Sequence, residues 1–146
     1  MPDNKTISEF RGEYAFLSNF YETDIYCWGF KYRNAEAAFQ AMKDPLQASL
    51  FVGLDAKAAK SLGRKVNLRK DWEQLKEEFM FTVCFAKFMQ NPELGEKLVA
   101  TENKTLIEGN TWGDTEWGVC NGRGKNMLGN ILMCIREKIK KFYGRY

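Results

Sequence analysis

A short alanine-rich segment carries polar residues at a spacing that could support chemistry. Glu36, Gln40 and Lys43 are separated by four and three positions, so they share one face of a helix. No other residue from Ala35 to Lys43 is polar. Such a face can line a pocket in which Glu36 is a catalytic carboxylate and Lys43 holds its charge or a ligand anion. It can equally be the solvated stripe of an amphipathic helix, and spacing alone does not separate the two interpretations.

A second candidate is the glycine-rich segment 112–126, which contains two tryptophans and two acidic residues before a predicted helix. Trp112 and Trp117 could stack on a nucleobase. The helix that follows could offer its first N–H groups to a phosphate. The alternative is a structural Ω-loop held by its tryptophans, so the segment predicts either a nucleotide site or a surface loop.

Two polar residues, Ser18 and Asn19, interrupt the apolar run from Phe16 to Tyr21. They can form a satisfied turn, or Asn19 can read the edge of a base or a ribose. The remaining charged groups are two basic sets, which are more typical of solvated faces than of nucleic-acid contacts. They are Lys57, Lys60, Arg64, Lys65, Arg69 and Lys70, and near the end of the chain Lys138, Lys140, Lys141 and Arg145.

The composition excludes several kinds of site. The 146 residues include no histidine, which removes Ser-His-Asp and Cys-His nucleophile systems and every His-ligated metal site. The four cysteines form no Cys-x-x-Cys pair, so we expect reduced thiols in a cytoplasmic protein, with no metal and no cofactor. The most apolar run, residues 79–88, is far too short to span a bilayer. We therefore expect no membrane association.

The elements that must position these residues are predicted to form one helix-rich α+β domain over residues 1–146, with a small β-hairpin near its N-terminus. Residues 25–28 and 30–32 predict the hairpin around Gly29. Asn34 can cap a helix over 35–43 that Asp44-Pro45 ends. Short helices are predicted over 47–52 and 56–62, ended by Gly53 and Gly63.

Longer helices follow in the second half of the chain. Asp71 is predicted to cap a helix over 72–90 whose buried face is Leu75, Phe79, Val83 and Ala86. Pro92 suits the first turn of a helix that ends near residue 99, and residues 105–107 predict a strand. The last helix is predicted over 125–142, with one apolar face formed by Leu128, Ile131, Leu132, Ile135 and Ile139.

Together these segments resemble the NADAR family, named for NAD and ADP-ribose, which includes the YbiA-type N-glycosidases. The resemblance covers residues 10–136 and rests on the order and spacing of several short motifs. They are Phe16-Leu17-Ser18-Asn19-Phe20, Ala35-Glu36 with Phe39-Gln40 and Lys43, Trp72 with Lys76 and Met80, Lys87-Phe88, Leu98 with Thr101, Ile107-Glu108, Asp114 with Trp117-Gly118, and the run from Gly124 through Asn126, Leu128-Gly129 and Leu132-Met133 to Arg136.

The resemblance implies an activity and a set of site residues. Members hydrolyse N-glycosidic bonds, in ribosylated pyrimidine intermediates of riboflavin synthesis or in ADP-ribosylated guanine. By position, the catalytic residues would be Glu36 and Asp114, supported by Lys43 and Glu108. The substrate-binding residues would be Ser18, Asn19, Phe20, Gln40, Trp72, Trp117, Gly118 and Asn126. Many relatives have serine and histidine where this chain has Ala35 and Ala37, which bears on the identity of the substrate.

The implied reaction agrees with the residue types present. Cleaving a ribosyl C–N bond passes through an oxocarbenium-like state, so carboxylates can stabilise charge and activate water without histidine or metal. The predicted partner is therefore a small-molecule nucleotide or an ADP-ribosylated substrate, with a modified nucleic acid as a possible form of it. The alternatives are a non-catalytic nucleotide- or ADP-ribose-binding module, or a nucleic-acid-associated protein that uses the basic C-terminal residues.

Overall fold

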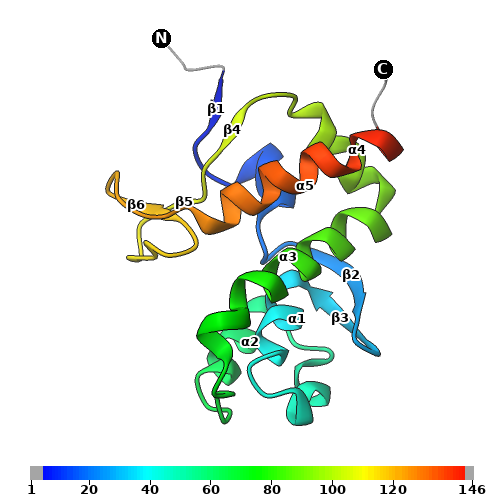
Figure 1. Ribbon diagram of the computed structural model, residues 1–146, viewed down its shortest axis with the longest axis vertical. Helices are drawn as coiled ribbons and strands as arrows, with labels where there is room; N and C mark the ends of the chain where they lie inside the picture. The colour runs from blue at the N-terminus through cyan, green and yellow to red at the C-terminus, as the bar shows by residue number, and fades with distance from the viewer. Residues whose placement is uncertain (1–4, 144–146) are drawn as a thin grey trace. The chain divides into compact units, whose positions relative to one another are not determined.

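The computed structural model describes residues 5–143 (Figure 1). Packing contacts group these residues in two compact units. The first unit contains residues 5–18 and 92–143, from both ends of the described chain, and the second contains residues 19–91. The predicted helix-rich α+β class is confirmed, and the single-domain organisation stays a prediction. Each unit is described by itself.

The second unit begins with the predicted hairpin. Strand β2 (Glu22–Cys27) pairs antiparallel with β3 (Phe30–Asn34), and Cys27 lies opposite Phe30. The two turn residues, Trp28 and Gly29, both have positive φ values, 49° and 88°. Positive φ at both positions produces the turn twist that matches the twist of paired strands. The strands are longer than predicted because Glu22 also pairs with Asn34, across a register shift between Glu22 and Ile25.

Helix α1 (Ala35–Ala41) follows β3 directly, and Asn34 caps it as predicted: Asn34 Oδ1 accepts a hydrogen bond from Ala37 N at 2.8 Å. The helix ends at Ala41, before Lys43, because the last N–H groups turn to carbonyls three residues back. Lys43 N donates to Gln40 O at 3.1 Å. Helix α1 packs against α2, α3 and the hairpin, which leaves none of its seven residues exposed.

Two short helices follow α1. Residues Pro45–Phe51 form the 3₁₀ helix η2, and α2 (Ala56–Gly63) begins at Asp55, whose carboxylate accepts from Ala58 N. Gly53 ends η2 in the left-handed region, with φ of 84°. The predicted role of Gly63 as a left-handed cap is wrong. It is the last residue of α2, and a Cβ there would overlap the side-chain oxygen of Gln40, so glycine is needed for the close approach of α2 to α1.

Helix α3 (Trp72–Gln90) has the predicted bounds, but Asp71 does not cap it. The Asp71 carboxylate instead pairs with Arg69, Nε to Oδ1, at 2.6 Å. The predicted buried face is also wrong except at Val83. The buried face lies one residue further along the helix and includes two lysines, because both lysine stems run along apolar surface. It is formed by Trp72, Lys76, Met80, Val83, Cys84, Lys87 and Phe88.

The first unit contains two pairs of short parallel strands. Strand β1 (Thr6–Ile7) pairs with β4 (Thr105–Leu106), which confirms the strand predicted there. Strand β5 (Gly109–Asn110) pairs with β6 (Val119–Cys120). The 3₁₀ helix η1 (Gly12–Leu17) buries Phe16 and Leu17. The strands thus tie the segment before η1 to the glycine-rich loop region.

Helices α4 (Pro92–Ala100) and α5 (Met127–Tyr143) pack on each other in the first unit, and α5 also contacts β4. Every residue of the predicted apolar face of α5 is buried. A Cβ on Gly129 would overlap Leu106 O, so glycine sets the closeness of α5 to β4. Arg136 Nη1 donates to Thr101 Oγ1 at 2.9 Å and to Lys104 O at 2.8 Å, which ties α5 to the end of α4.

All four cysteines are free thiols in the structure, and their reduced state in the cell stays a prediction. Over residues 5–143, no helix combines the length and the apolar character needed to cross a membrane. In the basic C-terminal set, Lys138 and Lys141 are exposed and Lys140 pairs with Glu137 at 2.8 Å. Arg145 lies outside the described residues.

Lys87 is fully buried on α3, and its ammonium group lies 5.2 Å from the centroid of the Phe88 ring and 5.7 Å from that of Tyr21. Burial lowers the pKa of Lys87 from 10.5 to about 8, because the charged form loses its hydration, and Cys84 opposes this shift. In the unfolded chain the pKa returns to its ordinary value. Between about pH 8 and 10.5, the Lys87 side chain is therefore protonated in the unfolded state and largely neutral in the folded state.

We predict that Lys87 contributes an increase in the free energy of unfolding as the pH rises from about 8 to 10.5. Lys87→Met should remove that increase, whereas Lys138→Met, at an exposed lysine, should keep it. The measurement is chemical denaturation of each protein across this range. Burial raises the pKa of Cys27 to about 11 and that of Tyr32 to about 12. Both residues are present in both variants, so their contribution to the pH dependence cancels when the variants are compared. An unchanged slope in Lys87→Met would contradict the prediction.

Candidate active site

Glu36 and Gln40 are buried side chains of α1, with exposed fractions of 9% and 6%. Gln40 Nε2 donates a hydrogen bond of 2.6 Å to Glu36 Oε2. The interpretation of these residues as a solvated stripe is therefore wrong, because α2, α3 and the hairpin cover α1. A buried carboxylate is retained at a considerable cost in hydration unless polar groups surround it, so this pair is the strongest candidate for chemistry in the second unit.

Lys43 lies just past the end of α1 and is half-buried. Its Nζ atom is 5.7 Å from the centroid of the Trp72 ring, which is within the range of a cation–π interaction. Burial lowers the pKa of Lys43, and the negative charge of Glu36 raises it in part. The structure thus brings Glu36, Gln40, Lys43 and Trp72 together, and their roles in the reaction stay predictions.

Trp72 is held in an aromatic cluster at the start of α3. Its ring centroid lies 5.1 Å from that of Phe39 and 6.1 Å from that of Phe79. Arg69 covers Phe79 at 5.0 Å, and its backbone N–H donates to Lys43 O at 2.9 Å. The backbone that carries Lys43 is therefore fixed beside the tryptophan through main-chain and ring contacts.

Asn19 supports the same helix from its N-terminal end. Its backbone oxygen accepts from Glu36 N at 3.0 Å, which satisfies an N–H group that the first turn of a helix leaves unpaired. Its buried side-chain amide donates to Met80 Sδ at 3.2 Å, and Cys84 Sγ donates to Asn19 Oδ1 at 3.7 Å. Phe20 is 45% exposed. Asn19 thus positions Glu36, and its role in binding a base stays a prediction.

Ala35 and Ala37, the two departures from the family pattern, have no exposed surface. They pack inside the second unit on either side of Glu36. Ser18 lies in the first unit, where its N–H group ends η1 by donating to Ala15 O at 3.0 Å. The two neighbours of Glu36 on α1 are therefore small, packed residues.

The other predicted carboxylates lie in the first unit. Asp114 Oδ1 accepts from Glu116 N at 3.1 Å and from Trp117 N at 2.9 Å. This is an Asx turn, in which a side-chain oxygen shapes the backbone two and three residues on. Asp114 therefore fixes the backbone at Trp117, and the turn supplies a structural role beside the predicted catalytic one.

Glu108, Gly118 and Asn126 come together at the start of α5. Asn126 Oδ1 accepts from Glu108 N at 3.0 Å, and Asn126 Nδ2 donates to Leu106 O at 2.9 Å. A Cβ on Gly118 would lie 2.9 Å from Glu108 Oε2, so glycine leaves room for that carboxylate. The structure thus places Asn126 and Gly118 around Glu108, with Asn126 acting through the backbone.

Asn110 was missed by sequence reasoning. It is 9% exposed, its Oδ1 accepts from Asp114 N at 3.0 Å, and its Nδ2 donates to Asp114 O at 2.8 Å and to Val119 O at 3.3 Å. The glycine-rich loop is therefore held by amide and carboxylate hydrogen bonds. One available signal was an asparagine four residues before an aspartate in a loop, because both residue types bond readily to nearby backbone.

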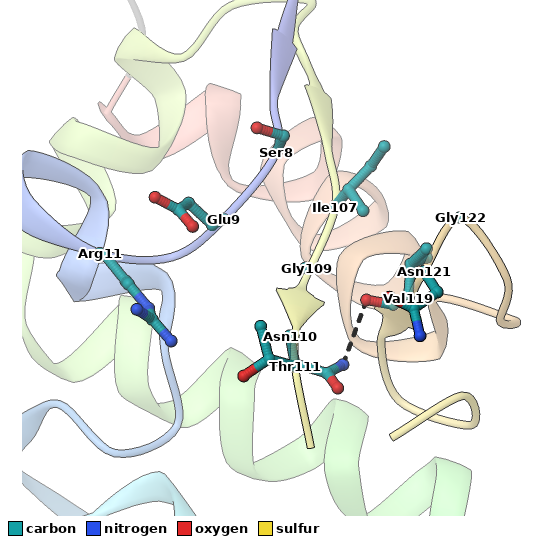
Figure 2. A pocket seen from close by; sticks show the side chains of 10 residues that line it. All are labelled: Ser8, Glu9, Arg11, Ile107, Gly109, Asn110, Thr111, Val119, Asn121 and Gly122. Atoms are coloured by element: carbon teal, nitrogen blue, oxygen red, sulfur yellow. Dashed lines mark hydrogen bonds between the residues drawn. The ribbon is translucent and has the colours of Figure 1, made fainter. Parts of the chain in front are cut away.

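A cavity of about 380 Å³ lies in the first unit, between the segment after β1 and the β5–β6 pair (Figure 2). Arg11, Thr111 and Asn121 are among the residues that line it, and Asn110 reaches it while bonded to Val119 O. None of the residues predicted for the site lines this cavity. Most of its lining side chains are exposed, so we do not assign it to the reaction.

Within residues 5–143, no group of three or more cysteine, aspartate or glutamate side chains is arranged to hold a metal ion. The expectation of a reaction without metal was made from the residue types, and it stays a prediction.

Comparison with known proteins identifies the family. The model of the NADAR domain matches residues 7–140, nearly the whole described chain. The chain belongs to the NADAR family. The solution NMR structure of the Escherichia coli protein YbiA is similar over 97% of this chain and 90% of that one, with a TM-score of 0.82 and 35% sequence identity. The family and fold implied by the sequence motifs are thus confirmed.

Two curated proteins of similar sequence have names that describe a function. N-glycosidase YbiA of Shigella flexneri serotype 5b (strain 8401) is 36% identical over 133 residues, covering 87% of this chain and 82% of the relative. A riboflavin biosynthesis protein of Vibrio vulnificus (strain YJ016) is 34% identical over 134 residues, or 88% of this chain. The chain spans 36% of the length of that second relative.

Trp117 tests whether the loop of this NADAR chain belongs to a ligand pocket. Because hydrogen bonds of Asn110 and Asp114 hold the loop backbone, we expect Trp117→Ala to weaken ADP-ribose binding by about 1–3 kcal/mol, the usual contribution of aromatic–base stacking. The melting temperature should change little. Titration calorimetry and thermal unfolding on the same preparation measure both, with Phe142→Ala as an exposed aromatic control. A large loss of melting temperature with unchanged affinity would make Trp117 a structural residue of an Ω-loop.

Proposed function

We propose that this chain is an N-glycosidase that hydrolyses the bond between a ribosyl group and a base, and that Glu36 is its principal catalytic carboxylate. The observation that carries the proposal is the buried Glu36 side chain, bonded to Gln40 at 2.6 Å beside Lys43 and Trp72. Membership of the NADAR family and the N-glycosidase names of its relatives support this reaction class.

The reaction breaks the C–N bond of the ribosyl group and forms a C–O bond with water. The electron pair of the broken bond leaves with the base, a proton moves to the base, and hydroxide equivalent is added to the sugar carbon. The sugar carbon develops positive charge on the way. A carboxylate beside that carbon stabilises the charge, and it also accepts a proton from the attacking water.

The neighbours of Glu36 suit this role. Gln40 holds the carboxylate in one orientation through its 2.6 Å hydrogen bond, which lowers the cost of reorganising the site during reaction. Lys43 attracts the same carboxylate and an anionic group of the substrate. Trp72 offers an aromatic surface under the Lys43 ammonium group. Glu36 and Lys43 thus supply opposite charges from one short stretch of chain.

The finer assignments follow the family resemblance. We propose a ribosylaminopyrimidine of riboflavin synthesis or an ADP-ribosylated guanine as substrate, free or within a modified nucleic acid. Asp114 and Glu108 stay proposed catalytic carboxylates, and the reaction uses no metal. The four free thiols support a reducing compartment, and we propose the cytoplasm as the location.

Glu36→Gln tests the assignment directly, because it keeps the size of the side chain and removes its charge. We expect turnover to fall by about 10²–10⁴, the range for a positioned acid–base group, with little change in KM. The measurement is release of free base by mass spectrometry, on a panel of ribosylaminopyrimidines and ADP-ribosylated guanosine, using a substrate that the unmodified protein cleaves.

The matched control is Glu78→Gln, the same change at an exposed position of α3. It should leave turnover and stability within the narrow range of most surface substitutions, about ±0.5 kcal/mol. If Glu36→Gln turns over within a few-fold of the unmodified protein, Glu36 is not part of the mechanism and Asp114 becomes the next carboxylate to substitute. Binding of ADP-ribose without base release from any substrate would instead support the non-catalytic binding module.

A further inference from the structure

We propose that Gly63, the last residue of helix α2, is a positioning residue for the proposed reaction. Because residue 63 has no side chain, the amide of Gln40 can lie against α2 and hold the Glu36 carboxylate in one orientation. This inference rests on the proposed N-glycosidase function. It adds a residue on a second helix, which acts on Glu36 through Gln40.

The backbone at position 63 does not require glycine. Gly63 is the last residue of α2 and is not among the glycines with positive φ, whereas Gly53, before the same helix, has a φ of 84°. Alanine is compatible with a helical backbone and is the residue type that favours it most. The reason for glycine at this position is therefore space rather than conformation.

The space beside Gly63 is occupied by one side chain. A Cβ on Gly63 would overlap Gln40 Oε1 and lie 2.7 Å from Gln40 Cδ, and its three nearest atoms all belong to that side chain. A Cβ on Gly129 would instead overlap the main-chain oxygen of Leu106. Main-chain atoms move only with their helix or strand, but the end of a glutamine side chain can turn about its own bonds. A methyl group at position 63 should therefore displace the Gln40 amide and leave α1 and α2 in place.

The displaced amide is the group that bonds to Glu36. Gln40 Nε2 donates to Glu36 Oε2 at 2.6 Å, while Gln40 Oε1 is buried against Gly63 and accepts no hydrogen bond from the described residues. A buried acceptor without a donor is costly, but turning the amide over would bring its oxygen against the negative carboxylate. No hydrogen bond at Oε1 opposes displacement. The position of the amide thus depends on its bond to Glu36 and on the space at Gly63.

The orientation of the Glu36 carboxylate links this packing to the reaction. Catalytic groups act within a narrow range of positions, and a misplacement of about 1 Å can cost about 100-fold in rate. Without the Gln40 bond, Glu36 keeps its charge but is less well oriented toward the sugar carbon. An interaction that matters only as the sugar carbon becomes charged changes kcat rather than KM.

The catalytic test is Gly63→Ala, with Ser61→Thr as the matched control, because that change adds one methyl group at an exposed position of the same helix. Gly63→Ala should lower kcat about 10- to 100-fold, as expected for a displaced catalytic group, with little change in KM. Its melting temperature should be unchanged or raised. Ser61→Thr should behave as the unmodified protein. A normal kcat in Gly63→Ala would overturn the inference and leave the proposed reaction standing.

A double-mutant cycle tests whether Gly63 acts through Gln40. Gln40→Ala removes the amide and leaves space for a methyl group at position 63, so adding Gly63→Ala should cause no further loss of kcat. Losses that multiply in the double variant would overturn the inference, because Gly63 would then act by another route. If Gly63→Ala alone does not fold, the double variant should fold and match Gln40→Ala in kcat. Failure of the double variant to fold where Gln40→Ala folds would also overturn it.

A measurement on the Gln40 amide is independent of turnover. In ¹H–¹⁵N NMR spectra, the side-chain NH₂ signals of Gln40 are identified by their loss in Gln40→Ala. The proton bonded to Glu36 should exchange slowly with water and lie downfield of the exposed Gln74 amide, because it is buried and bonded to a carboxylate. Gly63→Ala should remove both features, and Ser61→Thr should keep them. That result supports the positioning of Glu36 even where no base is released. Gln40 signals that Gly63→Ala leaves unchanged would overturn the inference.

Discussion

The arrangement of the second unit depends on burying a carboxylate on a helix that has no exposed face. All seven residues of α1 are buried, including Glu36 and Gln40. A buried carboxylate without partners would be strongly unfavourable, so its surroundings must supply hydrogen bonds and positive charge. Gln40 supplies the first and Lys43 the second. Glycine at position 63 is then required, because the packed Gln40 side chain leaves no space for a larger residue on α2.

A comparable constraint organises the loop region of the first unit. In this polar region, side-chain amides and a carboxylate hold the loop by hydrogen bonding to its backbone. The Asn110 side chain bonds to both the N–H and the carbonyl of Asp114, and Asn126 joins Leu106 to Glu108. These hydrogen bonds fix the backbone that carries the proposed site residues of this unit. Loops that a rigid scaffold positions often carry binding and catalytic residues.

The sequence was sufficient where a single periodic signal dominated. The apolar face of α5, the Asn34 cap and the hairpin around Gly29 are all confirmed, because each depends on local geometry or on a strict 3.6-residue repeat. The predicted buried face of α3 is wrong except at Val83, because it was built from apolar residues alone. Lys76 and Lys87 are in fact buried, and only the tertiary structure shows which faces of a largely apolar helix are covered.

In the candidate site, too, the sequence identifies the residue types, and only the structure shows what surrounds them. Family motifs identified Glu36, Gln40, Lys43 and Trp72, and the structure brings them together. Spacing alone could not distinguish a buried polar face from a solvated one, since both have the same periodicity. The contacts that cover α1 and that bring Trp72 to Lys43 were also beyond reach. They depend on how segments distant in the sequence pack, not on any pattern within one segment.

The central claim is hydrolysis of an N-glycosidic bond, and isotope labelling tests it most directly. The protein is incubated in H₂¹⁸O with ribosylaminopyrimidines and with ADP-ribosylated guanosine, and the products are identified by mass spectrometry. The account predicts free, unlabelled base and a sugar product that carries one ¹⁸O atom from water. Intact substrates after incubation with folded protein that binds ADP-ribose would contradict it, and the chain would then be a binding module rather than an enzyme.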